Sequence, residues 1–169
     1  MSLKLDQSQT QYGDWLSSYG EELLAQTIKA GISKLLKQVI IRTQKIGTPP
    51  NLIVEIRNVV DNKPGPIILA TEEILEENVP VEESELIINF SSPCGIIKDN
   101  PYAIMLYYKN YGGDSSNKYK IMYRDADTYP NGTVWYQKNP SSNWVNLGGD
   151  YYFKTYVYIP SPLPTFFRN

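Results

Sequence analysis

Apolar and polar residues alternate with a period of two through much of the second half of the chain. In the segment 51–60, Leu52, Val54 and Ile56 fall on one face, and charged residues fall on the other. A half-buried β-strand has this pattern because successive side chains point to opposite faces of the sheet. The alternation therefore predicts a strand that begins near Asn51.

The same pattern predicts further strands at intervals of about 10–15 residues. Segments 85–90 and 118–125 alternate, whereas 102–109 is apolar on both faces, as a central strand would be. Shorter apolar or aromatic runs predict the remaining strands, at 67–70, 133–138, 143–147 and 151–159. Turn residues separate these runs, and Asn131-Gly132 is the strongest hairpin signal among them. The spacing favours an all-β sandwich.

Two segments remain ambiguous by periodicity alone. The segment 71–78 suits one or two helical turns or a solvated acidic loop. In the segment 21–46, a helical stripe fits Leu24, Ile28, Ile32, Leu35, Leu36, Val39 and Ile40, with an interruption at Gly31. The residues VIIRTQKI at 39–46 instead suit a strand.

Composition is compatible with one sandwich domain at 1–159 followed by a Pro-rich extension at 160–169. The chain has 169 residues, with 14 Tyr, 12 Pro and 11 Gly. A chain of this length buries roughly 70% of its unfolded surface, so no disulfide is required. The single cysteine, Cys94, is expected to be an ordinary buried or loop thiol.

Charge and missing residue types exclude several classes of function. With 16 Lys+Arg against 18 Asp+Glu, the net charge of -2 gives no reason to expect a nucleic-acid partner. The chain has no histidine, which excludes Ser-His-Asp and Cys-His nucleophiles and histidine metal sites. No apolar run is long enough for membrane insertion, and we expect no signal peptide in the first 15 residues.

Read as an ordered series, the chain resembles a family of extracellular jelly-roll modules of archaeal and bacterial surface proteins. These are the choice-of-anchor modules, which look like carbohydrate-binding sandwiches. The resemblance rests on LDQSQTQYG (5–13), 25–58, PGPIILA (64–70), 101–119 and 129–157, about nine-tenths of the chain. Ile28 stands where the family usually has an aromatic residue. The resemblance implies a jelly roll of two antiparallel sheets with at most short helical turns, and strands at 25–30 and 35–46. It implies no catalytic residue.

Aromatic, acidic and amide side chains gather in the loops between residues 110 and 150. Sugars stack on exposed aromatic rings and receive hydrogen bonds from Asp, Asn and Tyr, so this region is a candidate glycan site. The candidates are Tyr111, Asp114, Tyr129, Trp135, Trp144 and Asp150. The alternative is an ordinary sandwich rim, since every second aromatic residue of a strand faces the core.

Three aspartates permit two further hypotheses. Asp125 and Asp127 have the Asp-x-Asp spacing of a calcium loop but lack its downstream Glu, so Ca²⁺ is the one candidate cofactor. With Asp150 they also permit a paired-carboxylate glycosidase, the least favoured class. Solvated turn aspartates are the favoured interpretation. Asn131 and Asn89 begin N-glycosylation sequons.

The last ten residues contain three prolines and then Phe166-Phe167, which predicts an assembly element. We expect a non-enzymatic structural or surface-binding subunit, located on a virion or an extracellular surface. The leading hypothesis is a virion protein of an archaeal virus, whose partners are its own copies or other virion proteins. The alternative is a carbohydrate-binding or adhesion module of a secreted surface protein, with a glycan as its ligand.

Overall fold

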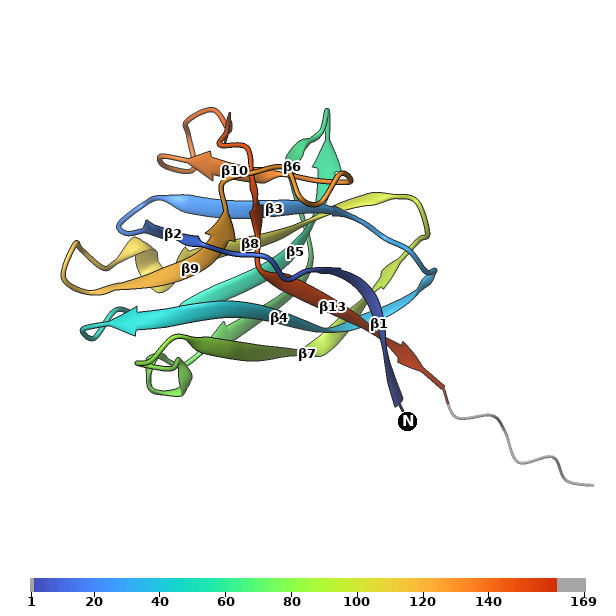
Figure 1. Ribbon diagram of the computed structural model, residues 1–169, viewed down its shortest axis with the longest axis horizontal. Coiled ribbons are helices and arrows are strands. Elements are labelled where there is room, and N and C mark those ends of the chain that lie inside the picture. Colours follow the sequence, from blue (N-terminus) through green and yellow to red (C-terminus); the bar gives the residue numbers. More distant parts are fainter. Residues whose placement is uncertain (1, 161–169) are drawn as a thin grey trace, which may run out of the picture.

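The computed structural model describes residues 2–160, and these form two antiparallel β-sheets packed face to face (Figure 1). This confirms the predicted all-β sandwich. Helical structure in this range is limited to two 3₁₀ turns, η1 (Glu76–Asn78) and η2 (Lys109–Tyr111), and no helix there is long and apolar enough to cross a membrane. The predicted assembly residues Phe166 and Phe167 lie outside the described residues.

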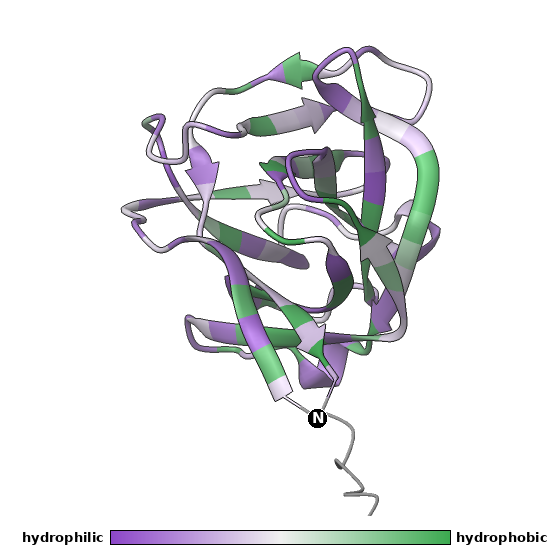
Figure 2. Cartoon of the chain, turned by 90° about the vertical axis from the view of Figure 1, so that its right-hand side faces the viewer, coloured by the Kyte–Doolittle hydropathy of each residue, from purple (hydrophilic) through white to green (hydrophobic). Residues whose placement is uncertain are grey.

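Sheet A has seven strands, in the order β1-β13-β4-β9-β12, with β7 also paired to β4 and β2 also paired to β9. Their bounds are β1 (Ser2–Gln9), β2 (Asp14–Ser18), β4 (Lys34–Ile46), β7 (Ser84–Ile96), β9 (Lys118–Arg124), β12 (Asp150–Tyr151) and β13 (Phe153–Ile159). In Figure 2 the strand at the N-terminus shows alternating hydrophobic and hydrophilic bands.

Sheet B has six strands, in the order β11-β10-β3-β8-β5-β6. Their bounds are β3 (Leu23–Lys29), β5 (Leu52–Val60), β6 (Lys63–Ile74), β8 (Pro101–Tyr108), β10 (Val134–Gln137) and β11 (Val145–Asn146). The chain crosses repeatedly between the two sheets, which fits a jelly roll.

The core lies between the sheets and follows the predicted alternation. Leu52, Val54 and Ile56 are buried, at 2%, 0% and 0% exposure. The largest fully buried side chains are Tyr108, Tyr119, Tyr151, Phe90, Phe153, Leu24, Ile28, Leu36, Ile41, Leu52, Ile56 and Ile88. Each buried aliphatic or aromatic side chain contributes about 1.5–3 kcal/mol, so this layer is the main source of stability.

The helical stripe in segment 21–46 is wrong, and β3 and β4 occupy the segment as the family resemblance implied. The physical reason is burial on both faces of β3. Leu24 and Ile28 face the core, while Leu23 and Ala25 are also buried on the opposite face. Two-sided burial removes the period-two signal. The helical alternative for 71–78 is also mostly wrong, because β6 continues to Ile74.

The hairpin predicted at Asn131-Gly132 is wrong as well. The strands before and after it, β9 and β10, belong to different sheets. Gly132 is required by close approach, because a Cβ there would lie 1.7 Å from the Thr27 carbonyl oxygen. A two-residue hairpin turn is instead formed by Asp61 and Asn62, which join β5 to β6 with φ of 49° and 63°.

Candidate functional site

The outer face of sheet B, which points away from the core, carries a second hydrophobic cluster. Leu23, Ala25, Met105 and Trp135 are buried there, and Tyr107 and Trp144 pack against them. An outer sheet face open to water would expose such side chains. Two segments shelter this face, and each has a local structural cause.

The first sheltering segment is the connection from β10 to β11. Trp135 of β10 pairs with Ala25 of β3, which places this connection beside the outer face. A turn closed by the Ser142 amide donating to the Asn139 carbonyl (3.0 Å) shapes the loop. The Gln137 side-chain amide donates to the Ser142 carbonyl at 2.6 Å, which fixes the loop that carries Trp144.

The second sheltering segment is the hairpin of β5 and β6. Its register shifts on either side of Arg57, and such β-bulges bend a hairpin. The Asn58 side-chain oxygen accepts the Ile67 amide at 2.9 Å, and a Cβ on Gly65 would lie 2.3 Å from the same oxygen. This tight contact explains the glycine in Pro64-Gly65-Pro66.

A hollow of about 240 Å³ lies between these two segments. Its lining includes Tyr111, Trp144, Arg57 and Gln137. Tyr111 is 40% exposed and stacks on Tyr107, with ring centroids 5.8 Å apart and planes inclined by 23°. The hollow thus combines two accessible aromatic rings with a guanidinium and an amide.

A second hollow, of about 320 Å³, lies on the same sheet and is lined by Thr27, Asn131, Asn146 and Trp135 among others. Trp135 is 7% exposed, and its indole N–H is buried without an acceptor among the described residues. A buried donor that lacks an acceptor costs about 1–3 kcal/mol, so this group calls for an explanation.

A buried carboxylate is bonded to Arg57, which lines the first hollow. The Glu55 side chain is 3% exposed and accepts hydrogen bonds from the Arg57 Nε (2.6 Å) and the Tyr107 hydroxyl (2.7 Å). Burial, and then the bond to Glu55, raise the pKa of Tyr107. Glu55 therefore holds the Arg57 guanidinium in one orientation at the wall of the hollow.

Of the six candidate ligand residues, the structure brings Trp135, Trp144 and Tyr111 to this one face. It does not bring Asp150 there, because that side chain is fully buried. Its carboxylate accepts the Thr128 and Tyr129 amides at 2.9 and 2.8 Å and the Gln26 side-chain amide at 2.9 Å. Burial raises the pKa of Asp150. Since Asp150 lies in sheet A and Gln26 in sheet B, this network joins the sheets.

Tyr129 and Asp114 also have structural roles. Tyr129 is 6% exposed, and its hydroxyl donates to the Gln7 side chain at 2.9 Å. Asp114 closes its own loop, where its carboxylate accepts the Asn117 amide at 2.9 Å. The Asn117 side chain is the main cause of the lowered pKa of Asp114. Neither residue lines the two hollows described above.

The remaining candidates lie on the surface. Asp125 and Asp127 are exposed, and the described part of the chain contains no group of three or more side chains suited to a metal ion. A calcium ion there would need mainly backbone and water oxygens, and the calcium site stays a prediction. Asn131 and Asn89 are exposed, so both sequons are accessible.

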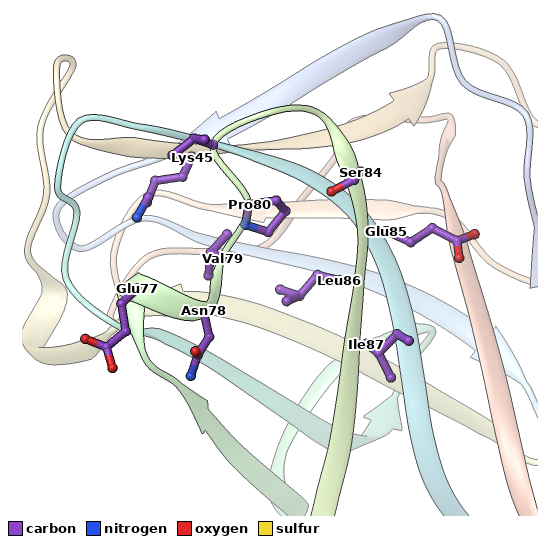
Figure 3. A pocket seen from close by; sticks show the side chains of 10 residues that line it. Lys45, Glu77, Asn78, Val79, Pro80, Ser84, Glu85, Leu86 and Ile87 are labelled. Atoms are coloured by element: carbon purple, nitrogen blue, oxygen red, sulfur yellow. The ribbon is translucent and has the colours of Figure 1, made fainter.

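A third hollow, of about 570 Å³, lies between the segment 77–81 and β7, and two of its charged side chains are already paired (Figure 3). Lys45 is bonded to Glu76 at 2.6 Å, and Glu85 to Lys154 at 2.6 Å. In Figure 3, Leu86 points toward Val79, and both are buried core residues. This hollow is therefore a surface depression over the core.

No protein-family model matches the chain, and no curated protein matches it. The resemblance to choice-of-anchor modules therefore stays a prediction.

Sequence reasoning missed Glu55, Arg57, Tyr107 and Gln137. Glu55 and Arg57 alternate with core residues, and this alternation predicted that both face solvent. The available signal was the sequence from Asp61 to Pro66, which holds the hairpin turn and the two prolines that line the first hollow. No local pattern indicates that β10 pairs with β3, about a hundred residues earlier.

Proposed function

We propose that this protein is a non-enzymatic binding module whose ligand is a carbohydrate, bound on the outer face of sheet B. The observation that carries the proposal is the first hollow, where Tyr111 and Trp144 lie with Arg57 and Gln137. An aromatic surface with a few fixed polar groups is the usual composition of a small-molecule site.

The chemistry of a sugar ring matches these groups. Its C–H faces stack on aromatic rings, for which Tyr111 is exposed and Trp144 half-buried. Its hydroxyl groups accept hydrogen bonds from Arg57 and exchange them with Gln137. The buried bond to Glu55 keeps the guanidinium in place before the ligand arrives, which reduces the entropy lost on binding.

Trp135, which lines the second hollow, supports the same assignment. The indole N–H itself is buried and out of reach of a surface ligand, so the contact would be made by the aromatic side chain. A glycan extending from the first hollow to the second would then contact both ends of the face.

The carboxylates support a module without glycosidase activity. Such enzymes place two carboxyl groups on either side of the scissile bond. Asp150 is fully buried and bonded by two backbone amides and Gln26, which keeps it away from a substrate on the surface. Glu55 does not line the first hollow, and its buried carboxylate is bonded to Arg57 and Tyr107.

The test is a glycan array followed by calorimetry on the selected glycan. Trp144→Ala and Tyr111→Ala should each weaken binding by about tenfold or more, because each removes a stacking ring. The matched control is Trp15→Ala, since Trp15 is 42% exposed on sheet A. Failure to bind any glycan at millimolar concentration, or an equal loss in the control, would refute the proposal.

The second candidate is a structural or adhesion subunit of a virion, as the sequence led us to expect. The observation that favours it is an exposed apolar surface on sheet A, which includes Leu3, Leu5 and Leu35. Co-purification of the chain with intact particles would test this candidate, and its absence from them would oppose it.

A further inference from the structure

The outer face of sheet A carries a row of apolar positions at the end where β13 leaves the sheet. Cross-strand pairing places Leu3 of β1 beside Tyr158 of β13, Tyr158 beside Leu35 of β4, and Leu35 beside Gly95 of β7. Figure 1 shows the start of β1 and the end of β13 side by side, and Figure 2 shows the hydrophobic bands near the N-terminus.

The next outward-facing positions extend this surface. Leu5 pairs with Tyr156, one step further along the same strands. Leu3, Leu5 and Leu35 are 43%, 45% and 46% exposed. We call these five residues, Leu3, Leu5, Leu35, Tyr156 and Tyr158, the apolar row. A contiguous apolar surface on a sheet face marks an interaction site more often than scattered single residues do.

The surface is also hollowed. A depression of about 190 Å³ is lined by Ser2, Leu3, Lys37, Asn89 and Tyr158. Beside it, a Cβ on Gly95 would have no other heavy atom of the described chain within 4 Å. The apolar row therefore offers a shallow recess, whereas the far end of the face is covered by ion pairs such as Lys154–Glu85 and Arg42–Glu83.

We propose that the apolar row receives the C-terminal segment 161–169 of a second copy of this chain, with Phe166 and Phe167 in the recess. The segment contains Leu163 and two phenylalanines, whose apolar side chains suit a recess lined by Leu3 and Tyr158. This inference does not rest on glycan binding.

A second copy is favoured over the same chain for a geometric reason. Ile159, the last residue of β13, pairs with Ser2 at the edge of the recess. Pro160, Pro162 and Pro164 each restrict the preceding residue to extended backbone, which disfavours an immediate reversal onto the row. Nine extended residues reach at most roughly 30 Å, far enough for a neighbouring copy.

Such a contact is heterologous, because one surface is the segment and the other is the recess. Repetition of a heterologous contact gives a closed ring or an open chain of subunits. The inference therefore assigns the protein a means of ordered self-assembly through one tail and one sheet face.

Sedimentation and light scattering over a range of concentrations test the proposal. The full chain should self-associate. A chain ending at Pro160, the double variant F166A/F167A and the variant Leu35→Gln should each associate at least about a hundredfold more weakly. The matched control is Ile68→Gln, an equally exposed apolar residue on sheet B, which should associate like the parent. Thermal unfolding should show that each variant is folded.

A mixing experiment identifies the occupant. L35Q keeps the segment and F166A/F167A keeps the recess, so the two variants should form a one-to-one dimer when mixed, although neither associates alone. Association of two recesses face to face would not be restored by mixing. The proposal would be overturned if the full chain is monomeric, or if truncation leaves association unchanged. It would also be overturned if the mixture stays monomeric, or if the segment covers the recess of its own monomer.

Discussion

The outer faces of the two sheets each carry a glutamate that accepts hydrogen bonds from a cationic side chain and a tyrosine hydroxyl, in different surroundings. On sheet B, Glu55 accepts hydrogen bonds from Arg57 and the Tyr107 hydroxyl. On sheet A, Glu85 accepts hydrogen bonds from Lys154 and the Tyr152 hydroxyl. The Glu55 side chain is 3% exposed and that of Glu85 is 33% exposed. The two glutamate clusters are thus similar in chemistry and differ in burial.

The segments that shelter a sheet face therefore decide how strongly its polar groups interact. Bulges in β5–β6 and the β10–β11 connection shelter the face of sheet B, so Glu55 acts in a low dielectric and fixes Arg57. Glu85 remains in contact with water, where an ion pair contributes at most about 1 kcal/mol. The sheltered face is suited to a small ligand, and the open face to another protein.

The strongest way to break this difference is to remove the cover. Gly132→Ala would place a Cβ 1.7 Å from the Thr27 carbonyl, so β10 would have to move from β3. We expect a loss of about 3 kcal/mol or more in the free energy of unfolding, measured in urea, together with a loss of the proposed glycan binding.

The matched control for Gly132 is Gly95→Ala on the open face. A Cβ there meets no other heavy atom of the described residues within 4 Å, and the φ of Gly95 is not in the left-handed region. Stability should change by less than about 1 kcal/mol. Equal losses at the two glycines would contradict the importance of the β10 contact.

The second prediction concerns the buried carboxylate itself. Glu55→Ala removes the acceptor of Arg57 and of the Tyr107 hydroxyl, and it leaves both donors sheltered from water. We expect a loss of about 2 kcal/mol in the free energy of unfolding, since Arg57 keeps some contact with solvent. Glu55→Gln keeps an acceptor for Tyr107 and should lose less. If the Glu55→Ala variant is as stable as the parent, the buried carboxylate contributes nothing to stability despite its shelter from water.

Strands that are buried on one face only could be predicted from the sequence. Strands that are buried on both faces, or that are rich in polar residues, could not. Leu52, Val54 and Ile56 alternate with polar residues because only one face of their strand meets the core, and the predicted strand is confirmed. In β3, Leu23 and Leu24 are both buried, so the pattern resembled a helix. β1 and β2 escaped prediction because these strands are rich in polar residues.

The candidate site could be predicted in part, by residue type. Trp144 and Tyr111 were chosen because aromatic residues in loops are candidates for stacking, and the structure places both in one hollow. Asp150 was chosen on the same reasoning, but pairing of its strand places it between the sheets. Arg57 was not foreseen, because its role depends on a bulge and on contacts between distant strands.

The smallest expected effect is that of Glu85→Gln on the open face, and it also tests the sign of the pH dependence. The hydrogen bond from Lys154, and then the one from Tyr152, lower the pKa of Glu85 from its ordinary value of 4.5. A carboxylate whose pKa is lower in the folded state stabilises the fold fully above pH 4.5. This contribution is lost as the pH falls from that value through the lowered pKa.

The variant should therefore be less stable than the parent at neutral pH by less than about 1 kcal/mol, because the pair is partly exposed and screened by salt. The difference should shrink as the pH falls below 4.5 and should also shrink in high salt. Urea unfolding of both proteins at several pH values and salt concentrations measures it. A difference that grows with falling pH, or one as large as that of Glu55→Ala, would contradict the proposed contrast between the two faces.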